Sequence, residues 1–220
     1  MKQMIINVIK LIGLMLLSQI PMTIMGIFIL TNEQASISFT VIQAIIVLLL
    51  LVAAIVVFLI WTKKSKLAEW KIQFVWENIG KILGGFGVLF LIAIVGGILM
   101  QLSDKDTTVN QAALDGISRA VPPIVMYALA GVGAPIMEEV VFRMGIRELL
   151  FPGMPKIALF VSSFLFAFVH TPTNFASWFI YLGMGLVFGF VYMKTRKIEV
   201  PVFLHFLWNT LAVLMMFAGM

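Results

Sequence analysis

Cysteine is absent from this 220-residue chain, histidine occurs only twice, and charged residues are scarce. Without cysteine, the chain can form no disulfide, no thiolate metal site and no cysteine nucleophile. Charged residues make up 11% of the sequence, against about 25% in soluble domains, and no stretch has the composition of an ordinary globular domain. These absences exclude a soluble second domain and place the protein's action in or beside a lipid bilayer.

Long apolar runs fill most of the chain, in which 62% of the residues are hydrophobic. Since a helix crosses the hydrocarbon core in about 20 residues, we predict an all-α, polytopic bundle of transmembrane helices with about seven spans, six to eight being compatible. No small-x-small cleavage site follows the first run, so we read it as a retained span rather than a signal peptide. The spans are predicted near residues 4–30, 38–61, 82–102, 120–150, 157–170, 175–193 and 200–217. In the sixth, Gly185 and Gly189 have the small-xxx-small spacing that lets neighbouring helices approach closely.

Lysine and arginine gather in three of the segments between the predicted spans. Positive segments near span ends remain on the cytoplasmic side of a membrane. We therefore predict that these segments and the N-terminus are cytoplasmic, and that residues 31–36, the polar loop 103–116 and residues 171–177 lie outside. The net charge of +5 is then explained by contact with anionic lipid at the inner leaflet, and no nucleic-acid partner is expected. The basic residues are Lys63, Lys64, Lys66, Lys71 and Lys81, then Arg143, Arg147 and Lys156, then Lys194, Arg196 and Lys197.

Three of the apolar spans contain polar or ionisable side chains. They are Glu138, Glu139 and Arg143 in the fourth span, His170 at the end of the fifth, and His205 and Asn209 in the seventh. Ionisable residues at membrane depth are costly, so they tend to face a bundle interior or a wet cavity. Counting about 1.5 Å of rise per residue from the flanking basic residues places Glu138, His170, His205 and Asn209 roughly 12 to 21 Å from the cytoplasmic ends. We therefore predict one shared hollow that is reached from the cytosol.

The spacing of these residues on a helix predicts different surroundings for them. Glu139 and Arg143 are four residues apart with the acid first, which favours a structural ion pair on one helix face. Glu138 is rotated by about 100° from Glu139, so it is predicted to remain the free carboxylate. His205 and Asn209 are also four apart and share a face. Taken singly, each feature also fits a helix interface or a helix end, but together they indicate a shared site.

Two kinds of hydrolytic chemistry fit this set of side chains. A carboxylate and an imidazole in a partly dry cavity can activate water by general acid and base catalysis, while a second histidine and an amide donate hydrogen bonds to an oxyanion. A glutamate and two histidines can equally form a three-ligand zinc site that keeps an open position for water. The residues alone do not choose between a metal-free and a zinc-dependent site.

The order and spacing of the motifs resemble those of the CPBP family, the CAAX proteases and bacteriocin-processing enzymes, which is also called the Abi family. The pattern is EExxxR, then FxxxH, then HxxxN, each on its own apolar segment. It is met by EEVVFR at 138–143, FAFVH at 166–170 and HFLWN at 205–209. Each motif alone is weak, whereas the three in order are specific, and the likeness covers about residues 119–214.

The resemblance implies an integral membrane endopeptidase that acts on a peptide or membrane protein. Relatives remove the last residues of prenylated CAAX proteins in eukaryotes, and in bacteria they are associated with bacteriocin immunity, peptide maturation or signalling. By the family pattern, Glu138 would activate water with help from His170. His205 and Asn209 would bind the oxyanion, and Glu139 would belong to an essential acidic pair. The expected cofactor is either none or zinc.

The motifs also divide the chain and leave two other functions open. We predict N-terminal transmembrane helices with a basic cytoplasmic loop over residues 1–118 and the catalytic membrane domain over residues 119–218. The absence of cysteine and the many Ile, Met, Phe and Lys residues favour a bacterial cell membrane. The alternatives are a non-catalytic immunity or scaffold protein and a proton-coupled transporter, because buried glutamate and histidine can also relay protons.

Overall fold

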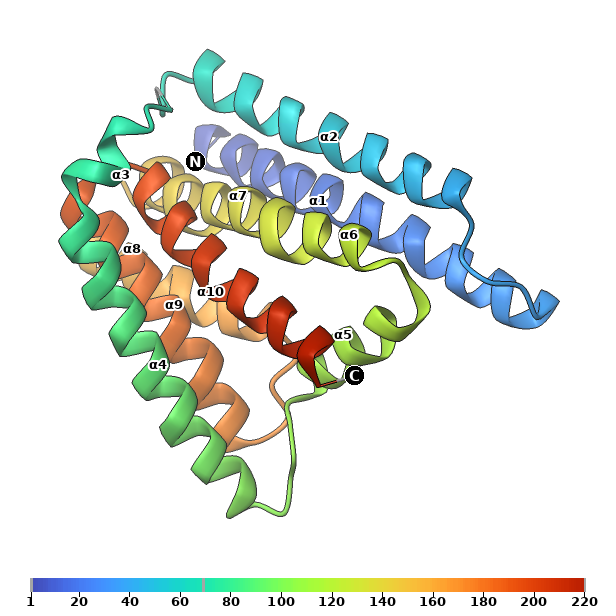
Figure 1. The fold of residues 1–220 in the computed structure, drawn as a ribbon. Helices are drawn as coiled ribbons and strands as arrows, with labels where there is room; N and C mark the ends of the chain where they lie inside the picture. The colour runs from blue at the N-terminus through green and yellow to red at the C-terminus, as the bar shows by residue number, and fades with distance from the viewer. Residues whose placement is uncertain (1, 69, 220) are drawn as a thin grey trace.

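Helices make up the fold of the computed structural model, which describes residues 2–68 and 70–219 and has no strand in that part of the chain (Figure 1). Six of the described helices are long and apolar enough to cross a membrane. They are α1 (Lys2–Ala35), α2 (Val41–Lys64), α4 (Ile79–Gln101), a composite helix over Pro123–Leu150, α9 (Phe175–Thr195) and α10 (Glu199–Ala218). A shorter apolar helix, α8, covers Pro155–Val169. The predicted helical membrane bundle is therefore confirmed, with six helices of spanning length and one short apolar helix.

The composite helix lies at the centre of the bundle. In the most apolar 18-residue window of this helix, 61% of the residues are buried inside the protein. The corresponding share is 17% in α1 and 22% in α2 and in α4. It packs on α1, α8 and α10. Since polar side chains in a membrane protein are best placed away from lipid, this is the helix in which buried glutamates are expected.

Two stretches of the composite helix are π-helical, which the sequence did not predict. The order is α6 (Pro123–Met126), η1 (Tyr127–Gly133), α7 (Ala134–Glu138) and η2 (Glu139–Leu150). A π-helix widens the turn and is often found at functional sites. The change from α7 to η2 falls between Glu138 and Glu139, so the two neighbouring carboxylates belong to segments of different helical geometry.

The remaining helices are arranged around this centre and around α10. Figure 1 shows α1 and α2 as an antiparallel pair along one side, and α4 and α9 running side by side along another. The helix α8 packs against both α9 and η2, and α10 packs against η1, α4 and α9. The N-terminus and the short helix α3 (Gln73–Glu77) lie at one end of the molecule, and the C-terminal end of α10 lies at the other (Figure 1).

The stretch 103–116, which we expected to be a polar loop, is in part a helix. Residues Val109–Ala120 form α5, and Thr108 caps it by accepting a hydrogen bond from the backbone N–H of Gln111 at 3.1 Å. Such capping satisfies an otherwise unpaired donor of the first turn. The helix lies beside the C-terminal end of α10 (Figure 1). The loop prediction was wrong for this half of the segment because the cap and a short amphipathic pattern outweigh its polar composition.

Glycines on α9 allow unusually close packing against its neighbours. A Cβ added at Gly185 would lie 2.9 Å from the Cα of Ser163 on α8, and one at Gly189 would lie 2.6 Å from Leu159 Cδ1. The sequence predicted such a contact from the small-xxx-small spacing of these two glycines, because small residues let membrane helices approach closely. The prediction is confirmed, and the contact brings the end of α8 next to α9.

Replacing Gly185 with alanine is expected to lower the stability of the fold. The new methyl group would meet backbone rather than a movable side chain, so α8 and α9 have to separate, at a cost of about 1–3 kcal/mol. Thermal unfolding of the purified protein in detergent measures the loss. Gly84→Ala on α4 is the matched control, because nothing lies within 4 Å of its added Cβ. Equal melting temperatures for the two variants would contradict the close contact.

Candidate active site

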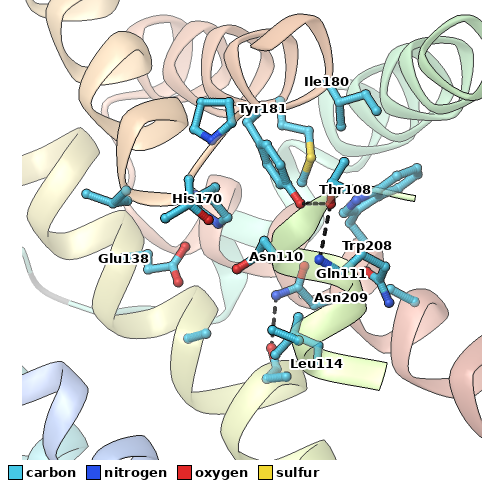
Figure 2. Close-up of a pocket in the computed structure, with 18 of the residues that line it drawn as sticks. Thr108, Asn110, Gln111, Leu114, Glu138, His170, Ile180, Tyr181, Trp208 and Asn209 are labelled. Atoms are coloured by element: carbon cyan, nitrogen blue, oxygen red, sulfur yellow. Dashed lines mark hydrogen bonds between the residues drawn. The ribbon is translucent and has the colours of Figure 1, made fainter. Parts of the chain in front are cut away.

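A cavity of about 1040 Å³ lies between the central helix, α10 and the helices around them. Its walls come from α1, α4, α5, η1, α7, η2, α8, α9 and α10. Figure 2 shows Glu138, His170 and Asn209 around this space. Of the residues that the sequence predicted for one site, Glu138, His170, His205 and Asn209 line the cavity. Glu139 and Arg143 do not line it and lie behind its wall.

Glu139 is fully buried and joins two other polar side chains. Its Oε2 lies 3.2 Å from the Nε of Arg143, and its Oε1 lies 3.0 Å from the Nδ1 of His205. The arginine contact is the ion pair that the four-residue spacing predicted. Its geometry is that of a charge contact rather than of an aligned hydrogen bond. The histidine contact, 66 positions away, could not be read from spacing within one helix.

The guanidinium of Arg143 is enclosed by aromatic rings. Its Cζ lies 4.4 Å from the centroid of the Phe166 ring, 5.7 Å from that of Phe188 and 6.0 Å from that of Phe142. The side chain is 1% exposed, and neither Nη1 nor Nη2 has a hydrogen-bond partner among the described residues. Attraction to the ring faces and to Glu139 therefore holds this cation inside the protein.

The imidazole of His205 is fixed between Glu139 and the cavity. Its Nδ1 donates to the Glu139 carboxylate, and its ring stacks on Phe188 with centroids 4.4 Å apart and planes 17° apart. The hydrogen bond at one ring nitrogen determines which nitrogen remains for other partners. Since the ring also lines the cavity, Nε2 is the atom that it offers there. Glu139 is thus placed to position His205 rather than to contact a substrate.

His170 is held at the end of α8 by its own backbone. Its Nδ1 lies 2.7 Å from the carbonyl oxygen of Phe166, which can only accept, so the proton is on Nδ1 and Nε2 carries a free lone pair. The ring is sandwiched between Phe166 at 4.5 Å and Tyr181 at 4.6 Å, centroid to centroid. A neutral imidazole held in this tautomer can accept a proton at Nε2.

The helix α9 begins at Phe175, after a short turn that follows His170, and its cap fixes this connection. Asn174 Oδ1 accepts a hydrogen bond from the backbone N–H of Ser177 at 2.8 Å, and Ser177 Oγ accepts one from the backbone N–H of Asn174 at 3.1 Å. Such a reciprocal cap holds the direction in which the chain enters a helix. The turn between α8 and α9 is thereby held at the wall of the cavity.

Glu138 ends α7 with its carboxylate directed into the cavity. Within the described part of the chain its side chain makes no hydrogen bond, and its buried Oε2 is unpartnered. Figure 2 shows it on the same side of the cavity as His170. Unsatisfied buried oxygens in a native protein require an explanation such as a catalytic role or a bound water. The carboxylate is placed to bind a water molecule.

Asn209 lies on the same face of α10 as His205, one turn further along. Its Nδ2 donates to the carbonyl oxygen of Ala130 in η1 at 2.9 Å. The contact ties α10 to the central helix and uses one of the two N–H groups of the amide. The second N–H remains for a ligand, which is compatible with the predicted oxyanion contact.

Sequence reasoning missed Tyr181 and Thr108. The Tyr181 ring stacks on His170, and its hydroxyl is 2.7 Å from Thr108 Oγ1 in a buried hydrogen bond. Tyr181 therefore links the start of α5 to the histidine. A tyrosine in an apolar span is indistinguishable in sequence from a packing residue, and only the α8–α9 contact brings it to His170.

The cavity lies toward the end of the bundle remote from the basic segments, which contradicts one of our expectations. It is lined by the C-terminal part of α4, the N-terminal half of α9 and α10 from His205 onward. Lys81 begins α4, and Lys194, Arg196 and Lys197 end α9 or follow it. The predictions of cytoplasmic basic segments and of a hollow reached from the cytosol are therefore incompatible. Depth counted along single helices does not show on which side of Glu138 a cavity between packed helices lies.

A bound zinc ion was the alternative that the sequence left open. Among the described residues, no three His, Asp or Glu side chains are close enough together to hold a metal ion. Nδ1 of His170 and of His205 is already engaged, so only their Nε2 atoms could act as ligands together with Glu138. This arrangement does not gather those three groups, and the reaction is therefore derived below from protein groups alone.

Comparison with known proteins assigns the chain to a family. Residues 120–211 match the family described as "Type II CAAX prenyl endopeptidase Rce1-like", a stretch that contains every site residue that the sequence predicted. The UPF0177 protein YvdC of Lactococcus lactis is 32% identical over 197 residues, which are 89% of this chain and 73% of that protein. YdiL of Bacillus subtilis is 33% identical over 141 residues, 61% of this chain and 54% of YdiL.

A third relative is named for its activity. The membrane-embedded CAAX protease MroQ of Staphylococcus aureus is 30% identical over 141 residues, 60% of this chain and 56% of MroQ. The matched segments thus span only about half the length of MroQ and of YdiL. No solved structure matches the chain. With the match to YvdC over most of both chains and the family match over the motifs, the protein belongs to the Rce1-like family of type II CAAX prenyl endopeptidases.

Proposed function

We propose that the protein is a membrane endopeptidase that hydrolyses a peptide bond in a membrane-associated peptide or protein of a bacterial cell membrane. One observation carries the proposal: the free carboxylate of Glu138 lines the same cavity as the imidazoles of His170 and His205, which come from two other helices. The relative named as a CAAX protease supports it. Peptides that take part in bacteriocin immunity, peptide maturation or signalling would be substrates of this kind.

The proposed reaction starts from a water molecule held by Glu138. The carboxylate removes a proton from this water, and the resulting hydroxide attacks the carbonyl carbon of the scissile bond. The carbonyl π electrons move to oxygen and form a tetrahedral oxyanion. The proton, held by Glu138 or passed to Nε2 of His170, then goes to the leaving amine as the C–N bond breaks. One water is consumed, and a carboxylic acid and an amine are released.

The oxyanion is stabilised by donors from α10. For Nε2 of His205 to donate, the ring must carry protons on both nitrogens, and the Glu139 carboxylate beside Nδ1 stabilises this imidazolium. The second N–H of Asn209 is the other proposed donor. Preorganised donors aimed at a developing negative charge contribute a large part of catalysis in acyl transfer. Arg143 holds Glu139 in place for this task.

Analysis of the peptides in the membrane tests the proposed function. Membranes from cells that lack the gene are expected to accumulate an uncleaved peptide, which disappears when the native gene is restored. Mass spectrometry of the extracted peptides identifies the substrate and the cleaved bond. A scaffold protein would produce no shortened peptide, and identical peptide sets from the two strains would contradict the proposal.

Replacing His205 with alanine is expected to lower turnover by about 10²- to 10³-fold, the usual effect of losing one oxyanion donor. The change also leaves Glu139 with one partner fewer, which costs about 1–3 kcal/mol of stability. The purified variant is assayed for kcat and KM on the accumulated peptide, and the loss should fall on kcat. Phe188→Leu, which removes the stacked ring and leaves the imidazole, is the control and should retain most activity. Unchanged turnover would remove His205 from the reaction.

Removal of metal ions is expected to leave cleavage at its full rate. The proposed proton transfers use only Glu138 and His170. Dialysis against a chelator, with the removal of metal checked by elemental analysis, should therefore leave the rate of cleavage unchanged. Loss of activity that is restored by zinc alone would overturn the metal-free reaction and would show that the three candidate ligands move together when the ion binds.

A further inference from the structure

The positions of the lining residues show toward which end of the bundle the cavity extends. On α4 they are Ala93, Gly97 and Met100, in the second half of a helix that begins at residue 79, and on α9 they lie between Trp178 and Met184, in the first half. On α10 they continue to Met216, two residues before the helix ends. The cavity therefore runs from Glu138 toward the end of the bundle where α5 and the C-terminal end of α10 lie (Figure 1).

Positive charge is concentrated at the opposite end. Most of the lysines and arginines lie at the end of α2 and just after it, at the end of η2 and the start of α8, and at the end of α9 and just after it, whereas Lys105 and Arg119 are the basic residues of the segment between α4 and the composite helix. In a membrane protein such an excess stays in the cytoplasm. The end of the bundle toward which the cavity extends is then the extracytoplasmic one.

The side chains at the end of the cavity beside α5, here called its mouth, suit an apolar peptide in contact with water. Asp106, Asn110 and Gln111 give the mouth a polar edge, and Leu114 and Ile117 of the same segment present apolar side chains to the cavity. Further in, Met137, Trp208 and other apolar side chains form most of the wall. The volume of about 1040 Å³ reaches the top of the usual range for small-molecule sites, about 300–1,000 Å³, so a peptide segment fits better than a single small ligand.

We propose that the substrate reaches Glu138 from the extracytoplasmic side, as an apolar peptide segment whose scissile bond lies in the outer half of the membrane. The proposal rests on the proposed peptidase function and adds the side of access and the substrate class to it. An exported peptide or the outer part of a membrane-spanning segment would be a substrate of this class, whereas the cytoplasmic tail of a membrane protein would not.

Thiol labelling of intact cells tests the side of access without requiring any activity. Because the natural chain has no cysteine, single cysteines report one position each. Lys105→Cys lies at the end toward which the cavity extends and Lys64→Cys at the basic end, and both positions are exposed. A membrane-impermeant maleimide should label the first in intact cells and the second only after the cells are permeabilised. The reverse pattern, or equal labelling of both in intact cells, would overturn the proposal.

Blocking the mouth tests whether substrate passes through it. Leu114→Cys lines the cavity, and Ala112→Cys lies on the same helix, is exposed and does not line it. A bulky impermeant maleimide applied to intact cells should stop processing of the peptide in the first variant and leave the second unaffected. Continued processing by fully labelled Leu114→Cys would overturn this route. Failure of the peptidase proposal is distinguishable, because untreated cells of both variants would then show no processing.

Discussion

Replacing Glu138 with glutamine is expected to lower the rate of peptide cleavage by about 10²- to 10⁴-fold, the range that general acid and base catalysis contributes. Glutamine has nearly the same shape but cannot take a proton from water. The carboxylate makes no hydrogen bond within the described part of the chain, so the exchange breaks no internal contact. Turnover of the accumulated peptide by the purified variant measures the loss, and the melting temperature should remain close to that of the native protein.

Glu77→Gln is the matched control for this experiment. Glu77 lies at the end of the short helix α3 and is exposed to solvent, outside the cavity. The same loss of one negative charge there should leave turnover unchanged. Cleavage at the native rate by the Glu138 variant would mean that another group activates the water. A transporter or scaffold interpretation would then deserve preference, because both retain their function without proton removal at this position.

Replacing Arg143 with alanine is expected to destabilise the fold by about 3–5 kcal/mol, because breaking a buried ion pair leaves an uncompensated charge. The carboxylate of Glu139 would retain only His205, and the space between the rings of Phe166 and Phe188 would be empty. The amount of folded protein recovered from membranes and its melting temperature in detergent measure the effect.

A double variant separates the loss of charge pairing from the loss of packing. Arg143→Met together with Glu139→Gln removes both charges and keeps most of the volume, and replacing a buried pair by apolar or neutral groups is often nearly neutral. Its melting temperature should lie above that of Arg143→Ala. Turnover should nevertheless stay low, because a glutamine cannot stabilise an imidazolium at His205. A single variant as stable as the native protein would contradict the pairing.

Much of this architecture could be predicted because it depends on local patterns. The length of the apolar runs predicts the membrane bundle, and the four-residue spacing predicts the contact of Glu139 with Arg143. The two glycines on α9 predict close packing because nothing larger fits there. Each of these features depends on neighbours along one helix, and such neighbours are set by helical geometry.

The features that escaped prediction depend on contacts between helices. The bond from His205 to Glu139 and the stacking of Tyr181 on His170 join residues on different helices. The π-helical turns after Met126 and Glu138 have no pattern of hydrophobic residues by which we could find them. The extent of the cavity toward one end of the bundle depends on which residues of several helices surround it, and depth along a single helix does not reveal this.

An experimental structure of the Glu138→Gln variant with the accumulated peptide bound would test most directly whether residues from the central helix, α8 and α10 act on one bond. The account predicts the scissile carbonyl carbon beside residue 138, with its oxygen within hydrogen-bonding distance of Nε2 of His205. A peptide bound outside the cavity, or one whose cleaved bond lies away from both side chains, would contradict it.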